Sequence, residues 1–159
     1  MADPFAKAKL EFFIWFATPI EEFSTVYQTD EPMVPYLVKD INNMSKILSE
    51  SILKSDIYSE NKNKILSVDF DKATNCKKST HFYFGFKVDK ELKSLNNLQT
   101  VTKEQSDKFL EKAGECVKAF LNQLKEKSPV RYKLAQHLRC LDPSNLLDAS
   151  LDKKMQGNF

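Results

Sequence analysis

The chain has 159 residues, of which 42% are apolar and 29% charged, and its formal net charge is +2. This apolar content supports a folded core and excludes a disordered chain. Only three glycines are present, which argues against a glycine-rich phosphate loop and against an all-β fold with many tight turns. Arg131 and Arg139 are the only arginines among 24 basic residues, so the chain has a weak electrostatic footprint for nucleic-acid binding.

The three cysteines, Cys76, Cys116 and Cys140, are odd in number and widely spaced. This argues against a disulfide framework and indicates a reducing compartment. The first residues lack the basic leader of a signal peptide, and the longest apolar run, residues 12–17, is far too short to cross a membrane. We therefore expect a soluble intracellular protein.

A first helix is expected from about residue 4 to residue 27, because apolar residues recur there at helical spacing. Asp3 followed by Pro4 is a typical helix start. Pro19 lies inside the pattern and lacks an N–H, so we expect a kink or break near Thr18. The apolar residues surround more of this helix than one neighbour covers. They are Leu10, Phe12, Phe13, Ile14, Trp15, Phe16, Ile20 and Phe23.

The stretch VYQTDEPMVPYLVKDI, residues 26–41, joins this helix to a second one expected over residues 32–54. Pro32 suits the first helical position, and Pro35 falls within the first turn, where no intrahelical N–H is lost. The two prolines predict a rigid corner that fixes the angle between the helices. The alternative is a binding role for this corner, through Gln28 and Asp30.

The middle of the chain carries weaker signals. Residues 55–63 read as a polar loop, and residues 64–71 as a short strand or an extended arm. The segment HFYFGFKV, residues 81–88, is expected to form a loop that tucks three rings under the helices: Phe82, Phe84 and Phe86. Asp89 is then expected to cap a short helix over residues 90–95.

The longest helix is expected to follow a capping box, with Thr102 at the cap and Gln105 three residues on. Its core stripe comprises Phe109, Ala113, Cys116, Val117, Phe120, Leu121 and Leu124. Gly114 within this helix predicts close packing by a neighbour. A last helix is expected from Ser128 to Asp142. The sequence thus predicts a mainly α, irregular helical bundle, with one domain over residues 1–143 and a flexible tail over residues 144–159.

Three arrangements of reactive residues are candidate sites. Cys76 with His81 and His137 with Cys140 can together supply a Cys2His2 zinc site, but the spacing is unusual, and buried inert thiols are favoured. Asp69 and Asp71 can supply the first carboxylates of a metal-dependent nuclease, but no second strand presents a matching acid. Cys116 or Cys140 with a histidine can form a nucleophile pair, which their apolar stripes disfavour. We therefore expect no metal, no cofactor and no catalytic residue.

Five motifs occur in order along the chain: KLEFF (9–13), YQTDEPMVPYL (27–37), GFKVDKEL (85–92), KEKSP (125–129) and LRCLDP (138–143). In this order they resemble transposase-like proteins derived from the hAT superfamily of DNA transposons. The resemblance covers residues 5–143, and the corner and the CLDP end are its specific parts. Pro19 and the aromatic stretch at residues 81–86 depart from the family pattern.

The resemblance implies a helical middle segment of such a transposase, without the catalytic acids, the zinc finger or the dimerisation segment of the complete protein. We therefore expect a non-enzymatic remnant that acts through protein contacts or self-association. A metal-dependent nucleic-acid-processing protein and a Lys-rich helical DNA-binding module are the alternatives. Nuclear localisation and nucleic-acid contact are implied by the resemblance alone, cytoplasmic localisation being the alternative. The corner formed by Gln28, Asp30, Pro32 and Pro35 is the only candidate interaction site assigned to particular residues.

Overall fold

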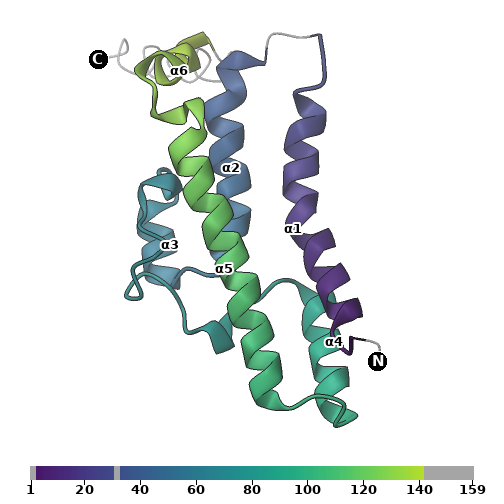
Figure 1. Cartoon of the computed structure of the whole chain (residues 1–159). Coiled ribbons are helices and arrows are strands. Elements are labelled where there is room, and N and C mark those ends of the chain that lie inside the picture. Colours follow the sequence, from purple (N-terminus) through teal and green to yellow (C-terminus); the bar gives the residue numbers. More distant parts are fainter. Residues whose placement is uncertain (1–2, 31–32, 142–159) are drawn as a thin grey trace, which may run out of the picture.

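A computed structural model describes residues 3–30 and 33–141, except for the side chains of residues 136, 139 and 140, and confirms the expected mainly α fold (Figure 1). The α-helices are α1 (Ala6–Val26), α2 (Leu37–Glu50), α3 (Ser55–Asn61), α4 (Phe86–Asn97), α5 (Lys103–Lys127) and α6 (Lys133–His137). Short 3-10 turns lie between or after them: η1 (Val34–Tyr36), η2 (Ile65–Ser67), η3 (Ser79–His81), η4 (Pro129–Arg131) and η5 (Leu138–Leu141).

The central element is α2, which contacts α1, α5, α3 and the η2 turn. Met44, Leu48 and Ile52 from this part of the chain enter the main hydrophobic cluster, and Leu48 and Ile52 are fully buried. Ser45 and Ser49 are buried as well, and their hydroxyls donate to backbone carbonyls of the same helix. The buried face of α2 therefore combines large apolar residues with small residues whose polar groups are satisfied.

An aromatic cluster joins α1 to the segment before α4. The Phe84 ring is buried and lies edge-on to Phe12 at 5.1 Å and to Trp15 at 5.2 Å between ring centroids. Phe82 is also buried, as expected, but Phe86 is exposed because it opens α4 instead of continuing the loop. The expectation that Phe86 is tucked under the helices is therefore wrong.

Gly114 marks a close approach on α5, as its sequence context predicted. A Cβ atom at this position would overlap with the ring of Phe82, so only a glycine lets this ring lie against the helix. Gly85 has a different role, because its φ of 91° lies in a region that favours glycine and allows the chain to turn into α4.

The region from residue 55 to residue 81 differs most from the sequence-based expectation. Residues 55–61 form the helix α3 rather than a polar loop, because Ile57 and Tyr58 pack against the core. Residues 64–71 form the η2 turn followed by an irregular stretch. Within the described residues no strand occurs, and one isolated bridge between Leu53 and Cys76 is the only β-type pairing.

The long helices α1 and α5 keep most of their predicted bounds. α1 runs unbroken through Pro19, so of the expected kink or break the break does not occur. The capping box of α5 is present, since the Thr102 hydroxyl accepts from the Gln105 N–H at 3.2 Å and the Gln105 side chain accepts from the Thr102 N–H at 2.8 Å. α4 begins at Phe86, and Asp89 therefore lies in its first turn rather than at its cap.

The expected last helix is divided into η4, α6 and η5. Residues 142–159 lie outside the described part of the chain, and so do the predicted domain boundary at residue 143 and the predicted tail. Among the described residues, no helix is both long and apolar enough to cross a membrane.

Candidate protein-interaction site

The proline corner connects α1 to α2 and is closed by a hydrogen bond. The Tyr27 hydroxyl, just after α1, donates to Asp40 Oδ2 in the first turn of α2 at 3.2 Å. Gln28 and Asp30 are exposed, Pro35 is half-buried within η1, and Pro32 lies outside the described residues. The contact between Tyr27 and Asp40 supports the architectural interpretation of the corner.

Removing this hydrogen bond provides a test of the corner. Burial, followed by the charge of Asp40, raises the pKa of Tyr27 above its ordinary value of about 10. The neutral phenol is thus favoured in the folded state, and its contribution to stability is complete below pH 10 and is lost as the pH rises above it. We expect Tyr27→Phe to lower the free energy of unfolding by about 0.5–1.5 kcal/mol at pH 7. Above pH 10, the free energy of unfolding of this variant should decline less steeply than that of the native chain.

Urea unfolding of the native chain and of Tyr27→Phe, at pH 7 and above pH 10, measures this difference in the free energy of unfolding. Tyr83→Phe is the matched control, because Tyr83 is exposed and its N–H bonds to the carbonyl of Ser51, at the opposite end of α2 from the corner. Identical pH slopes for the native chain and Tyr27→Phe would contradict the assigned role of the hydroxyl.

The four residues of the proposed zinc set have different surroundings. The Cys76 thiol is buried and donates to the Phe70 carbonyl at 3.2 Å, and this burial raises its pKa. His81 is exposed, with Nδ1 at 3.1 Å from the Thr80 hydroxyl. His137 is exposed, and the side chain of Cys140 lies outside the described residues. No group of three or more metal-binding side chains occurs in the described part of the chain.

The two carboxylates proposed for a nuclease site are engaged in a surface turn. The Asp71 N–H donates to Asp69 Oδ1 at 3.0 Å, and Asn122 of α5 donates to Asp71 Oδ2 at 2.9 Å. Both side chains are exposed. This arrangement fastens the irregular stretch after η2 to α5 and presents neither carboxylate into a cavity.

Cys116 corrects the predicted stripe of α5. The apolar pattern of the sequence predicted that Cys116 lies in the core, but the residue is exposed. Its neighbours Ala113 and Val117 are buried, and Phe120 is half-buried. α5 thus buries a narrower face than its apolar pattern indicated, because its neighbours lie on one side of it.

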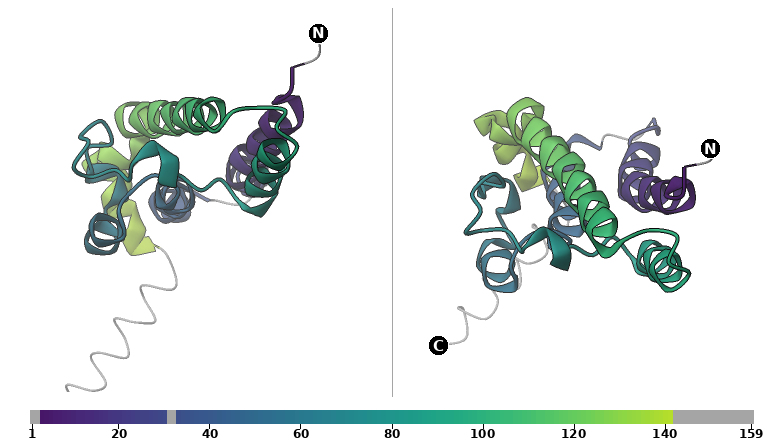
Figure 2. Two further views of the ribbon diagram at one scale, coloured as in Figure 1. Left: turned by 90° about the horizontal axis from the view of Figure 1, so that it is seen from below. Right: turned by 60° about the horizontal axis from the view of Figure 1, so that its bottom comes forward.

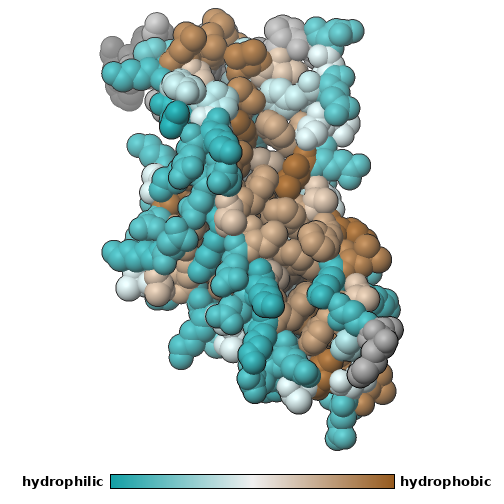
Figure 3. Space-filling view, in the orientation of Figure 1, coloured by the Kyte–Doolittle hydropathy of each residue, from teal (hydrophilic) through white to brown (hydrophobic). Residues whose placement is uncertain are grey.

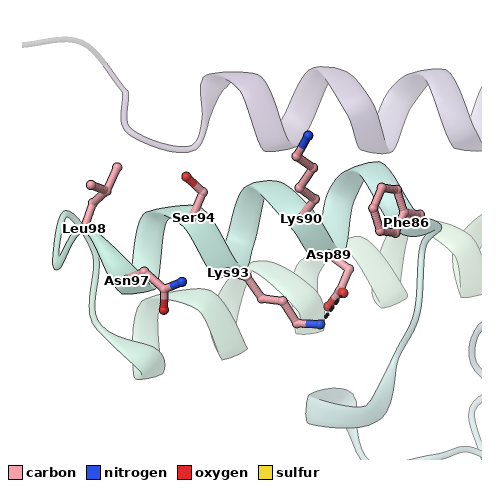
Figure 4. Close-up of a pocket in the computed structure, with 7 residues that line it drawn as sticks. All are labelled: Phe86, Asp89, Lys90, Lys93, Ser94, Asn97 and Leu98. Atoms are coloured by element: carbon pink, nitrogen blue, oxygen red, sulfur yellow. Dashed lines mark ion pairs between the residues drawn. The ribbon is translucent and has the colours of Figure 1, made fainter.

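The surface of α4 carries an open hollow rather than an enclosed site (Figure 4). Its lining consists of Phe86, Asp89, Lys90, Lys93, Ser94, Asn97 and Leu98. Asp89 and Lys93 form an ion pair at 2.6 Å across one turn of the helix. All of these residues belong to α4 and its C-terminal cap, so no second element converges on a ligand there.

The most distinctive surface is the outer face of α1. Leu10, Phe13 and Ile14 are 59%, 57% and 47% exposed, although each is large and apolar. By the helical period they share one face with Ala6 and Ala17, which are exposed as well. We call these five residues the α1 stripe. The opposite face, with Ala8, Phe12 and Pro19, is buried.

Neighbouring elements leave the α1 stripe open. α4 runs antiparallel beside the N-terminal half of α1, with Lys7 at 2.7 Å from Glu91 and Lys87 at 3.9 Å from Glu11 (Figure 2). On the other flank, rings of α1 and α5 meet, with Phe16 and Phe120 edge-on at 5.3 Å. Hydrophobic side chains reach the surface between these two helices (Figure 3). α2 also contacts α1, so the α1 stripe faces away from the three helices that contact α1.

The sequence indicated the excess of apolar residues on this helix but not which of them are exposed. Trp15, one of the apolar residues that surround this helix, is half-buried against Phe84. Comparison with known proteins found no matching family model, no similar curated protein and no similar solved structure. The resemblance to hAT transposases therefore stays a prediction from the sequence motifs.

Proposed function

We propose that this chain is a non-catalytic protein-interaction module that binds an amphipathic helix of a protein partner along the α1 stripe. The observation that carries the proposal is the exposure of three large apolar side chains, Leu10, Phe13 and Ile14, on one face of one helix. Single exposed apolar residues are ordinary, but neighbouring ones at helical spacing are typical of an interface.

A helix is the shape that fits this surface. The α1 stripe is long and narrow, with large side chains in its middle and Ala6 and Ala17 towards its ends. Small residues let a second helix approach closely, and the large ones fill the grooves on that helix. Binding through apolar side chains at helical spacing is a common mode of protein recognition.

Descent from a hAT-type transposase is part of this proposal and rests on the five sequence motifs. A segment that evolved within a larger protein would have covered one face of α1 with other parts of that protein. Nuclear localisation and nucleic-acid contact follow from the same resemblance. The lysine-based alternative gains little support from α5, where Lys108 pairs with Glu104 and Lys112 lies among acidic residues.

Photo-crosslinking tests the proposal. We expect p-benzoylphenylalanine at position 13 to give a discrete protein adduct in cells of the organism that carries the gene. The control places the same group at position 115, an exposed site on α5. If the chain labelled at position 13 gives no adduct that the chain labelled at position 115 lacks, an interaction role for the α1 stripe is contradicted.

A further inference from the structure

We infer that the partner of the α1 stripe is a second copy of the chain, whose α1 packs antiparallel to the first across a two-fold axis. This inference rests on the proposed function and identifies the partner. A two-fold interface must be complementary to itself, since every contact between two different residues occurs twice. The α1 stripe and its flanks satisfy this condition in shape and in charge.

The shape condition follows from the order of residues along α1. When two copies run in opposite directions about a point between Phe13 and Ile14, Leu10 of each copy faces Ala17 of the other. A large side chain thus meets a small one at both ends of the contact. Phe13 and Ile14 lie beside the two-fold axis, where Phe13 of each copy meets Ile14 of the other. Exposure of all these residues in one copy leaves them free for this contact.

The charge condition follows from the residues that continue the same face. Lys7 lies one turn before Leu10 and Glu21 one turn after Ala17, and both are exposed. In the antiparallel pair, Lys7 of one copy approaches Glu21 of the other, on the same side of the interface. In a parallel pair, each of these residues would instead meet its own like charge.

α4 strengthens the positive end of this pattern. It lies beside the N-terminal half of α1, and Lys90 extends from it toward α1 (Figure 4). Lys87 is held near Glu11 in the same region. Glu21 makes no ion pair with any residue that the structure describes. Lys7 and Lys87 are paired with Glu91 and Glu11 within each copy, and Lys90 makes no ion pair with any described residue. Each copy therefore presents one base in excess at the N-terminal end of the α1 stripe and an unpaired acid at its C-terminal end.

The expected dimer is weak and depends on concentration. A standard interface buries about 800 Å² per partner, which is more than one pair of helices of this length provides. Lysine contacts from α4 enlarge the area, but their effect is reduced by salt because they are exposed.

Sedimentation equilibrium of the full chain, up to about 100 µM and at low salt, tests the inference. We expect reversible dimerisation that Phe13→Asp weakens by at least about tenfold, because it places a charge in the centre of the contact. Glu21→Lys should weaken it about tenfold, because two attractive pairs become repulsive. The double variant Lys7→Glu with Glu21→Lys should restore part of the dimerisation, because opposite charges again face each other across the interface, although the substitution at position 7 breaks the ion pair of Lys7 with Glu91 within each copy.

Glu22→Lys is the matched control, since Glu22 is exposed but lies off the α1 stripe. It changes the net charge as Glu21→Lys does and should leave dimerisation unchanged. Thermal melts of all variants establish that each remains folded. A chain that stays monomeric would overturn the inference, and so would a dimer that is insensitive to Phe13→Asp or that the double variant fails to restore even in part.

The two proposals fail differently. If the chain sediments as a monomer and its adduct at position 13 contains a different protein, the inference of a second copy is overturned and the interaction role stays intact. An adduct with twice the chain mass of 18.4 kDa would support both. Absence of any adduct at position 13 would contradict the interaction role itself.

Discussion

Replacement of Phe84 by alanine is expected to lower the free energy of unfolding by about 3–5 kcal/mol, the usual range for a buried aromatic ring. Phe84 is 1% exposed and joins α1 to the segment before α4 through its contacts with Phe12 and Trp15. Because Phe84 directly precedes Gly85 and the start of α4, the variant should also loosen the packing of α4 against α1. Loss on this scale is a large fraction of the stability of an ordinary domain.

Urea unfolding of Phe84→Ala measures this loss, and Phe120→Ala is the matched comparison. The sequence pattern placed Phe120 in the core, but its ring is half-buried and lies edge-on to Phe16 at the surface. We therefore expect Phe120→Ala to lose about half as much as Phe84→Ala. Equal losses for the two variants would contradict this ranking of the two sites.

Gly114→Val is expected to destabilise the protein by about 2–3 kcal/mol. Any side chain at this position overlaps with the Phe82 ring, which is itself buried and cannot move without displacing its neighbours. A β-branched residue gains only a few tenths of a kcal/mol over glycine in helix propensity, so propensity does not offset the overlap.

A double-mutant cycle isolates the contact between Gly114 and Phe82. Phe82→Leu removes the ring edge, and Gly114→Val should therefore destabilise this background by at least about 1 kcal/mol less than it destabilises the native chain. Glu115→Val is the control, because this neighbouring position on α5 is exposed and should change stability by less than about 0.5 kcal/mol. Simple additivity in the cycle would refute the proposed overlap.

Elements with strong local signals were predictable from the sequence. The capping box at Thr102 fixes the start of α5, and both side chains make the predicted hydrogen bonds. Gly114 predicted a close neighbour because a glycine in a helix is otherwise unfavourable. These features depend on residues a few positions apart, which is the range over which a sequence pattern is informative.

Features that depend on distant residues were not predictable. α3 has a polar, short sequence, and it is stabilised by contacts of Ile57 and Tyr58 with the core. Cys116 shares the helical spacing of buried residues but is exposed, because no element among the described residues covers that side of α5. For the candidate site, the surplus of apolar residues on α1 was visible in the sequence. The exposed face became clear only from the positions of α2, α4 and α5 around it.

Pro19 has a consequence for how α1 moves. It supplies no amide hydrogen to the helix ladder, so the carbonyl of Trp15 has no N–H one turn ahead to bond with. Beyond Pro19, residues 20–26 contain two acids, Glu21 and Glu22, and the last turn contains no base. Acids near the C-terminal, negative end of a helix are unfavourable. The native helix should thus open in two steps, its final turns exchanging their amide hydrogens with solvent well before the turns that contain Phe12. A second copy that engages Glu21 would slow that exchange and join the two halves into a single cooperative unit.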